Sequence, residues 1–180
     1  MNTHTQIAVF GGGCFWCTEA VFQKLKGVQS VLPGYSGGQG GHPTYEQVSS
    51  GTSGFAEVIR FEYDPEQISY RDLLEVFFAT HDPTTLNRQG NDVGTQYRSA
   101  IFYANEEQKQ QAEDIIHELT NAHAYRDPIV TTLEALQNFY EAEEYHKNYY
   151  ERNKNQPYCM VIINPKLKKF KEKFASLIQD

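Results

Sequence analysis

The 180-residue chain carries 16 Lys and Arg against 23 Asp and Glu, which gives a formal net charge of −7. Because phosphate groups and anionic lipids repel an acidic chain, this balance argues against binding to nucleic acid or to a membrane surface. The sequence has no apolar run near the ~18 residues of a membrane span, and residues 1–6 lack the apolar core of a signal peptide, so we expect a cytoplasmic protein. Length and the lack of a linker predict one domain over residues 1–180.

Hydrophobic spacing and turn residues predict a regular succession of strands and helices. Short apolar or alternating runs that end at Gly, Pro or Asp indicate strands, and apolar positions three or four apart behind a capping residue indicate helices. In chain order we expect a strand at 7–10, a helix at 14–26, strands at 28–35 and 55–63, a helix after Ser69, a strand at 99–103, a helix from Asn105 to about His123, and a strand at 128–133. After these we expect a short helix near 139–150, a loop through Cys159 and an amphipathic ending from Pro165.

The order strand–helix–strand–strand–helix–strand is typical of the split β-α-β unit. It predicts an α+β, ferredoxin-like two-layer sandwich with a mixed or antiparallel sheet, helices on one face and a long irregular C-terminal segment. Alternation along the strand at 55–63 places Phe55, Glu57 and Ile59 on the same face.

The most informative stretch is Gly11 to Cys17, which reads Gly-Gly-Gly-Cys-Phe-Trp-Cys. Three glycines after a strand allow a sharp turn and leave no side chain above Cys14. Cys14 then lies in the first turn of a helix, where free N–H groups and the helix dipole favour a thiolate. The alternative is a structural cysteine buried between the strand and the helix.

Cys14 and Cys17 also form a C-x-x-C motif, which in a cytosolic protein indicates a redox dithiol or half of a zinc site. Zinc is the weaker interpretation, because no second C-x-x-C or H-x3–5-H pair follows and only Cys159 remains. The odd number of cysteines argues against a secreted disulfide framework.

Two further features were weighed as functional sites. A phosphate-binding loop is disfavoured, because the glycine run lacks the third spaced glycine of a dinucleotide fingerprint and no G-K-[ST] occurs. His81, followed by Asp82, and His146 are candidates for acid–base catalysis, although a lone histidine more often has a structural role.

These residues belong to a longer pattern. Residues 13–17 (GCFWC) resemble the signature of the type A peptide methionine sulfoxide reductases, and further blocks follow with matching order and spacing. The blocks are VLPGYSGG (31–38), PTY (43–45), SGTSGFAE (50–57), YDP (63–65), HDP (81–83), QGNDVGTQYRS (89–99) and AEEYH (142–146). The resemblance extends from residue 10 to about residue 160, nearly the whole chain.

The resemblance implies that Cys14 is the nucleophile and Glu57 the acid. It implies that Tyr45 and Tyr97 bind the oxygen and that Asp92 is the active-site aspartate. Phe15 and Trp16 are the aromatic residues that hold the substrate methyl group. Phe55 departs from the pattern, because the family usually has His at this position, two residues before Glu57.

This set of side chains suits the reduction of a sulfoxide, whose sulfur is partly positive and whose oxygen is partly negative. Cys14 supplies a soft nucleophile at sulfur, and a protonated Glu57 in an apolar setting supplies the proton at oxygen. The resulting Cys14 sulfenic acid must condense with a second thiol. We favour Cys159 as this resolving thiol over Cys17, because a loop moves more readily than a packed helical turn.

The resemblance implies methionine-S-sulfoxide, free or in proteins, as the substrate and thioredoxin as the electron donor. It implies a role in protein repair after oxidative damage, with no cofactor and no metal. Two alternatives stay open: a dithiol–disulfide oxidoreductase that uses Cys14 and Cys17, and a non-enzymatic module that binds methionine-containing peptides in an aromatic cleft.

Overall fold

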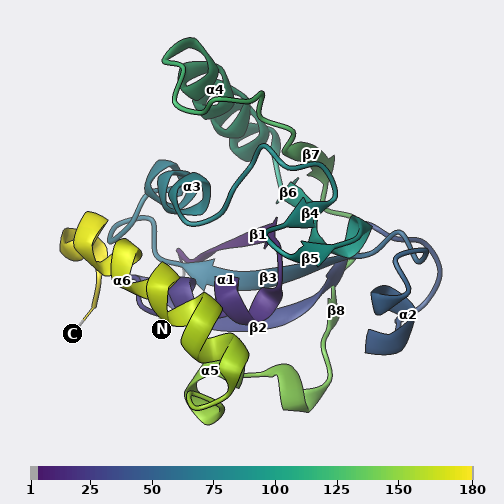
Figure 1. Ribbon diagram of the computed structural model, residues 1–180. Helices are drawn as coiled ribbons and strands as arrows, with labels where there is room; N and C mark the ends of the chain where they lie inside the picture. Colours follow the sequence, from purple (N-terminus) through teal and green to yellow (C-terminus); the bar gives the residue numbers. More distant parts are fainter. Residues whose placement is uncertain (1–3, 180) are drawn as a thin grey trace.

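The centre of the computed structural model, which describes residues 4–179, is a sheet of six strands in the order β7-β6-β1-β3-β2-β8 (Figure 1). The strands are β1 (Gln6–Gly12), β2 (Val28–Ser36), β3 (Ala56–Tyr63), β6 (Ser99–Tyr103), β7 (Thr132–Ala135) and β8 (Tyr140–Glu141). All neighbours pair antiparallel except β7, which runs parallel to β6. The inner order β6-β1-β3-β2 is that of the split β-α-β unit, so the predicted fold class is confirmed.

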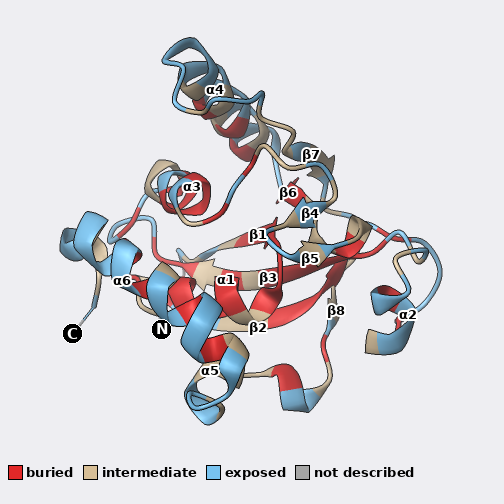
Figure 2. Ribbon diagram, in the orientation of Figure 1, coloured by how far each residue is buried: buried red, intermediate tan, exposed pale blue. Residues whose placement is uncertain are grey.

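The longer helices cover one face of this sheet. The helices are α1 (Phe15–Phe22), α2 (Tyr45–Ser49), α3 (Tyr70–Ala79), α4 (Glu106–Asn121), α5 (Tyr149–Arg152) and α6 (Asn164–Lys173), and a small hairpin is formed by β4 (Arg88–Gln89) and β5 (Asp92–Val93). Buried side chains from α1, α3, α4 and α6 join one apolar cluster with the sheet. Figure 2 shows the outer sides of α4 and α6 exposed, whereas the sheet and α1 are largely buried. None of the helices within residues 4–179 is long and apolar enough to cross a bilayer.

The alternation along β3 separates the two faces of the sheet as predicted. Ile59 and Phe61 belong to the core under the helices, whereas Ala56 and Val58 belong to a smaller apolar cluster on the opposite face. Glu57 has the same parity as Ile59 and therefore lies on the helix side, where it contacts the start of α1.

Two of the predicted helix starts are fixed by side-chain caps. Ser69 Oγ accepts a hydrogen bond from the Asp72 N–H at 3.0 Å, and Asn105 Oδ1 accepts one from the Gln108 N–H at 2.8 Å. Each such cap contributes about 1 kcal/mol to stability. The capping residues therefore predicted the starts of α3 and α4 correctly.

The second half of the chain departs from three sequence predictions. The strand expected at 128–133 runs instead from Thr132 to Ala135. The helix expected near 139–150 is replaced by β8, a 3-10 turn (Glu144–His146) and α5, because Asn148 adopts a left-handed φ of 53° that interrupts any helix there.

The third departure concerns the segment through Cys159. It is a π-helical turn, Cys159–Ile163, that continues directly into α6 rather than a loop. Cys159, Ile163, Leu167 and Phe170 are all buried and follow one another at helical spacing. This period is present in the sequence, but it begins before Pro165, the predicted start of the amphipathic element. Pro165 lies in the first turn of α6, directly after the π-helical turn.

Candidate active site

Cys14 lies at the junction where β1 turns directly into α1, as the N-cap residue of the helix. The turn depends on Gly13, whose φ is +93° and at which a Cβ atom would lie 2.7 Å from the side chain of Gln89. Only glycine fits this position without strain. The Cys17 N–H donates to the Cys14 carbonyl at 3.1 Å and closes the first turn. The local sequence thus places the Cys14 thiol at a helix N-terminus, as predicted.

Glu57 lies against this helix N-terminus and is buried, with only 1% of its surface exposed. Its Oε1 accepts a hydrogen bond from the Phe15 N–H at 3.2 Å, and its Oε2 has no hydrogen-bond partner within residues 4–179. Burial raises the pKa of Glu57 to about 8, and the negative charge of Asp92 adds to the shift, while the bond from Phe15 opposes it. Glu57 is therefore protonated at neutral pH and has a proton to donate.

Tyr45 and Tyr97 bring two phenols into the electrostatic range of Glu57. Tyr45 begins α2, and Tyr97 ends a 3-10 turn, Thr95–Tyr97. Burial, followed by the negative charge of Glu57, raises the pKa of Tyr45 to about 12 and also raises the pKa of Tyr97. Both phenols therefore keep their protons and can donate hydrogen bonds.

A carboxylate that the sequence analysis did not single out holds Tyr45 in place. Glu143 accepts hydrogen bonds from the Tyr45 N–H and from the Tyr35 hydroxyl, both at 2.8 Å. The Tyr35 ring packs beside Phe15, with the ring centroids 5.7 Å apart. Both residues lie inside matched sequence blocks, at positions 31–38 and 142–146, and that was the only signal that could have pointed to them.

The aromatic wall predicted from Phe15 and Trp16 is present and fixed by neighbours from the C-terminal segment. Trp16 stacks on Tyr149 with centroids 3.7 Å apart, and its indole N–H donates to His146 Nδ1 at 3.0 Å. The buried Phe15 ring lies 5.0 Å from the His146 ring. Burial lowers the pKa of His146, so its imidazole is neutral and accepts the Trp16 hydrogen bond. His146 thus orients Trp16 in this arrangement.

Phe55 supplies an apolar surface instead of the histidine usual at its position. It is 2% exposed, and its ring lies so close to Gly38 that a Cβ atom there would approach it to 2.3 Å. Its ring also meets Tyr140 edge-on at 5.9 Å. Phe55 precedes β3 on the same side as Glu57, and an apolar neighbour there favours the protonated carboxyl.

His81 has a structural role. Its ring nitrogens contact the Phe77 carbonyl and, at 2.8 Å, Ser99 Oγ, which ties the end of α3 to β6. Burial lowers its pKa to about 4, so it is neutral at physiological pH. Its candidacy for acid–base catalysis is not supported by these contacts.

The C-terminal segment closes the site over Cys14. The Tyr158 hydroxyl donates to Asp92 Oδ2 at 2.8 Å and lies 3.5 Å from Cys17 Sγ, and the Tyr158 ring meets Trp16 edge-on with centroids 5.7 Å apart. Cys14 is only 8% exposed, and a cavity of about 210 Å³ remains above it. The segment at 156–163 therefore narrows the approach to Cys14.

All three cysteines are buried free thiols. Burial raises the pKa of Cys14, whose thiol is hydrogen-bonded to Cys17. That hydrogen bond lowers the pKa of Cys17, and the positive charge of Lys166 and the hydroxyl of Tyr158 contribute further. Burial therefore opposes the thiolate that the helix N-terminus favours at Cys14, and the thiolate predicted there stays a prediction.

The expected loop position of Cys159 is also wrong. This residue is 0% exposed, and burial raises the pKa of its thiol. Within residues 4–179, no group of three or more His, Cys, Asp or Glu side chains is placed to hold a metal ion.

A buried cysteine at a helix N-terminus, beside a protonated carboxyl and two phenols, defines a thiol-dependent reductase of the α+β class. Residues 6–178 match the family described as "Peptide methionine sulfoxide reductase". The chain is 57% identical over 175 residues to "Peptide methionine sulfoxide reductase MsrA" of Acinetobacter baumannii strain SDF, covering 97% of this chain and 99% of the relative. It is 53% identical to the protein with the same description from Saccharolobus solfataricus, with 97% of each chain covered.

Solved structures agree with this result. Reduced Mxr1 from Saccharomyces cerevisiae superposes with a TM-score of 0.79 at 32% identity, covering 88% of this chain and 91% of that chain. Mxr1 in complex with Trx2 superposes with a TM-score of 0.57 at 25% identity, covering 83% and 87%. The chain belongs to the peptide methionine sulfoxide reductase family, type A.

Because Glu57 is buried, we predict that the free energy of unfolding depends on pH. The folded-state pKa of Glu57, about 8, lies above the ordinary value, so the folded protein binds the extra proton and its stability falls as pH rises from about 4.5 to 8. Glu57→Gln removes this loss. Urea unfolding should show the variant more stable than the parent by up to about 3 kcal/mol at pH 7, and equal to it or less stable at pH 4.

Glu62→Gln on the same strand is the matched control, since Glu62 is only partly buried. It should leave the pH dependence of unfolding unchanged. A Glu57→Gln variant that follows the parent at every pH would show that Glu57 is ionised in the folded protein.

The closed site predicts slow modification of Cys14. Tyr158→Ala removes the ring that packs on Trp16 and the hydroxyl that is bonded to Asp92. The rate of Cys14 alkylation by iodoacetamide, followed by peptide mass spectrometry, should rise at least about 10-fold, because each 1.4 kcal/mol lost from the closed state is a factor of ten in opening. Tyr103→Ala, at the end of β6, should not change the rate, and equal rates in both variants would contradict closure by Tyr158.

Proposed function

We propose that this protein reduces methionine-S-sulfoxide, free or in proteins, to methionine, with Cys14 as the nucleophile and Glu57 as the proton donor. The observation that carries the proposal is the buried, protonated Glu57 bound to the N–H of Phe15, the residue that follows Cys14. Reduction of a sulfoxide requires a soft nucleophile and an acid within reach of one sulfur–oxygen bond, and this pair provides both.

In the proposed reaction, the Cys14 sulfur attacks the sulfoxide sulfur while Glu57 gives its proton to the oxygen. The sulfur–oxygen bond then breaks as the doubly protonated oxygen leaves as water, which leaves Cys14 bonded to a sulfonium. Water attacks the Cys14 sulfur, methionine leaves with the electron pair of the sulfur–sulfur bond, one proton returns to the site, and Cys14 ends as a sulfenic acid. Tyr45 and Tyr97, whose raised pKa values keep them protonated, donate hydrogen bonds to that oxygen. Trp16 contacts the S-methyl group, for which sulfur–aromatic attraction contributes about 1 kcal/mol.

We further propose that Asp92 holds the closing segment between turnovers. Its carboxylate accepts the Tyr158 hydroxyl, and no other contact joins this tyrosine to the β4–β5 hairpin among the described hydrogen bonds. When substrate displaces Tyr158, Asp92 is left facing the cavity that contains Cys14 and Cys17. We assign Phe15, which is fully buried, to the methyl-binding side together with Trp16.

Regeneration requires a second thiol, and we propose Cys159, with Cys17 as the alternative. Cys17 has the lower pKa and is hydrogen-bonded to Cys14, which favours direct condensation. Cys159 belongs to the segment that narrows the approach to Cys14, and in the proposed cycle this segment shifts so that Cys159 approaches the sulfenic acid. Condensation forms a disulfide and releases water.

Thioredoxin is the proposed electron donor for this disulfide. The yeast structure in complex with Trx2 superposes on this chain over most of its length and supports the assignment. The proposed reaction needs no cofactor and no metal, because every electron passes through thiols. We place the protein in the cytoplasm, where thiols are kept reduced and where it repairs oxidised methionine.

A second candidate is dithiol–disulfide exchange on protein substrates by Cys14 and Cys17. The hydrogen bond between the two thiols and the lowered pKa of Cys17 favour it, because these features are typical of redox dithiols. Nothing in this activity uses Glu57 as an acid, and reduction of insulin disulfides tests it directly. A binding module without catalysis would keep its cellular function in Cys14→Ser.

Cys14→Ser tests the nucleophile. A hydroxyl at neutral pH is neither ionised nor soft, so the variant should form no methionine in a single-turnover assay with a methionine-S-sulfoxide peptide. The parent and Cys159→Ser should each form about one methionine per enzyme, since Cys14 alone performs the first step. Methionine formation by Cys14→Ser above the uncatalysed background would overturn the proposed function.

Thioredoxin-driven turnover of cysteine variants distinguishes the two candidate resolving thiols, Cys159 and Cys17. Cys159→Ser should keep its single-turnover burst but lose thioredoxin-driven turnover, because thioredoxin attacks a disulfide and not a recessed sulfenic acid. Dithiothreitol should restore part of the turnover. Cys17→Ser should stay within a few-fold of the parent, whereas the reverse pattern would assign the resolving role to Cys17.

A further inference from the structure

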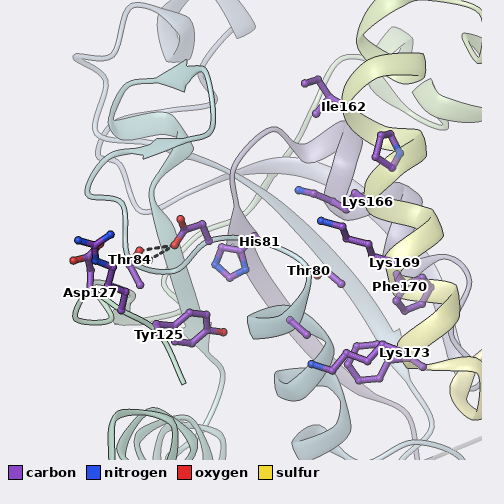
Figure 3. A pocket seen from close by; sticks show the side chains of 15 residues that line it. Thr80, His81, Thr84, Tyr125, Asp127, Ile162, Lys166, Lys169, Phe170 and Lys173 are labelled. Atoms are coloured by element: carbon purple, nitrogen blue, oxygen red, sulfur yellow. Dashed lines mark hydrogen bonds between the residues drawn. The ribbon is translucent and has the colours of Figure 1, made fainter. Parts of the chain in front are cut away.

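The C-terminal segment builds a second cavity that the proposed reaction does not use. It has a volume of about 680 Å³ and lies between α6 and the loop that follows α3. Lys166, Lys169 and Lys173 extend into it from α6, and Figure 3 shows their side chains directed towards the loop of His81. Arg126 lines the opposite side. We call this cavity the basic groove.

The basic groove concentrates positive charge in an acidic protein. Within α6, five lysines accompany one glutamate, whereas the whole chain carries a net charge of −7. Lysines at 166, 169 and 173 share one helix side, and like charges at this spacing repel one another. None of the three forms an ion pair with another residue in the 4–179 range.

The acidic residues of the groove do not neutralise this charge. Asp82 and Asp127 are the carboxylates that line it, against three lysines and Arg126. Asp82 accepts hydrogen bonds from the Thr84 N–H and hydroxyl, which hold it on the far wall. Among the residues that line the groove, the positive charges therefore exceed the negative ones by two.

An exposed apolar turn lies at the head of the basic groove. Met160, Val161 and Ile162 are 55%, 67% and 37% exposed, and they directly follow Cys159. Ile162 and Lys166 line both the basic groove and the cavity above Cys14 and Cys17, so the two sites are continuous. An apolar centre with a charged rim is the usual anatomy of a protein–protein interface.

We propose that the apolar turn at 160–162 and the basic groove together dock the acidic face of the protein disulfide reductant. This inference rests on the proposed function and assigns its partner a surface. A reductant must bring its thiolate to the disulfide that holds Cys159 or Cys17, and residues 160–162 are the first surface it meets beside Cys159. The three lysines then extend about 10 Å along α6, a reach suited to a folded partner.

Charge complementarity supports a protein reductant over a sulfoxide substrate. A sulfoxide reaches Cys14 before any disulfide exists, whereas a protein reductant must approach the disulfide beside residues 160–162. The reductant acts after this step, when Cys159 is oxidised. Attraction between a basic rim and an acidic partner accelerates association and weakens as salt is added.

Two double variants on the same helix test this assignment. Lys169→Glu/Lys173→Glu reverses charge inside the basic groove, and Lys168→Glu/Lys171→Glu makes the same charge change on exposed residues outside it. With an acidic thioredoxin and its NADPH-dependent reductase, the groove variant should lose about 10-fold or more in kcat/KM for thioredoxin at low salt. The outer variant should lose less than 3-fold, and both should match the parent when dithiothreitol supplies the electrons.

Salt and the apolar turn provide two further readouts. Salt should screen the attraction once its concentration rises from about 20 to about 300 mM. This change should lower kcat/KM for thioredoxin in the parent but not in the groove variant. Val161→Ser should lower kcat/KM for thioredoxin a few-fold and leave the turnover with dithiothreitol unchanged. These results would support docking at both parts of the surface.

Other results would overturn the docking. Equal losses in the two double variants would show a general effect of net charge. A groove variant with unchanged thioredoxin kinetics but a raised KM for acidic sulfoxide peptides would assign the groove to the substrate. If the parent failed to reduce sulfoxide even with dithiothreitol, the proposed function would fall and the docking with it, whereas dithiothreitol turnover without a groove effect contradicts the docking alone.

Discussion

The hydrogen bond from the Phe15 N–H to Glu57 is the contact on which the site depends. It joins the N-terminus of α1 to the middle of the sheet, so a carboxyl that would otherwise be too costly to bury acquires one fixed partner. The remaining desolvation is relieved by protonation. The same contact therefore anchors the helix behind Cys14 and keeps an acid beside it.

The surrounding residues follow from this constraint. A neutral carboxyl needs an environment without cations, and the groups shown to act on Glu57 or to feel its charge are the Phe15 N–H, Asp92 and the phenols of Tyr45 and Tyr97. Glu143, a polar group that would compete for the Glu57 carboxyl, is held by hydrogen bonds from the Tyr45 N–H and the Tyr35 hydroxyl. The packed side chains desolvate the site, and this desolvation sets the protonation states of its residues.

The C-terminal segment that packs over the site also contributes to the burial of the Cys14 thiol. Cys14, the proposed nucleophile, is buried, which raises the pKa of its thiol, and the Tyr158 hydroxyl lies 3.5 Å from the neighbouring Cys17 Sγ. A buried thiol is protected from adventitious oxidants. The segment that narrows the approach to Cys14 is also the one that carries Cys159 and the basic groove.

Much of the fold was predictable because it depends on local rules. Alternation along β3 assigned Glu57 to the core face, and Ser69 and Asn105 marked their helix starts, since neither signal needs knowledge of distant residues. The region after residue 135 was predicted poorly, because its short elements take their conformation from packing against α1 and the sheet. The continuous helical spacing from Cys159 onward was visible but was obscured by Pro165.

The sequence alone determined that Cys14 lies at a helix N-terminus after a strand, because three glycines and the following helical residues leave the backbone no other route. The matched blocks predicted roles for Glu57, Tyr45, Tyr97, Asp92 and the aromatic pair Phe15 and Trp16. Only the tertiary structure decided that the Cys14 and Cys159 thiols are buried and that Tyr158 packs over the site. Those properties depend on desolvation, and the solvent exposure of a side chain is set by segments more than a hundred residues away in the chain.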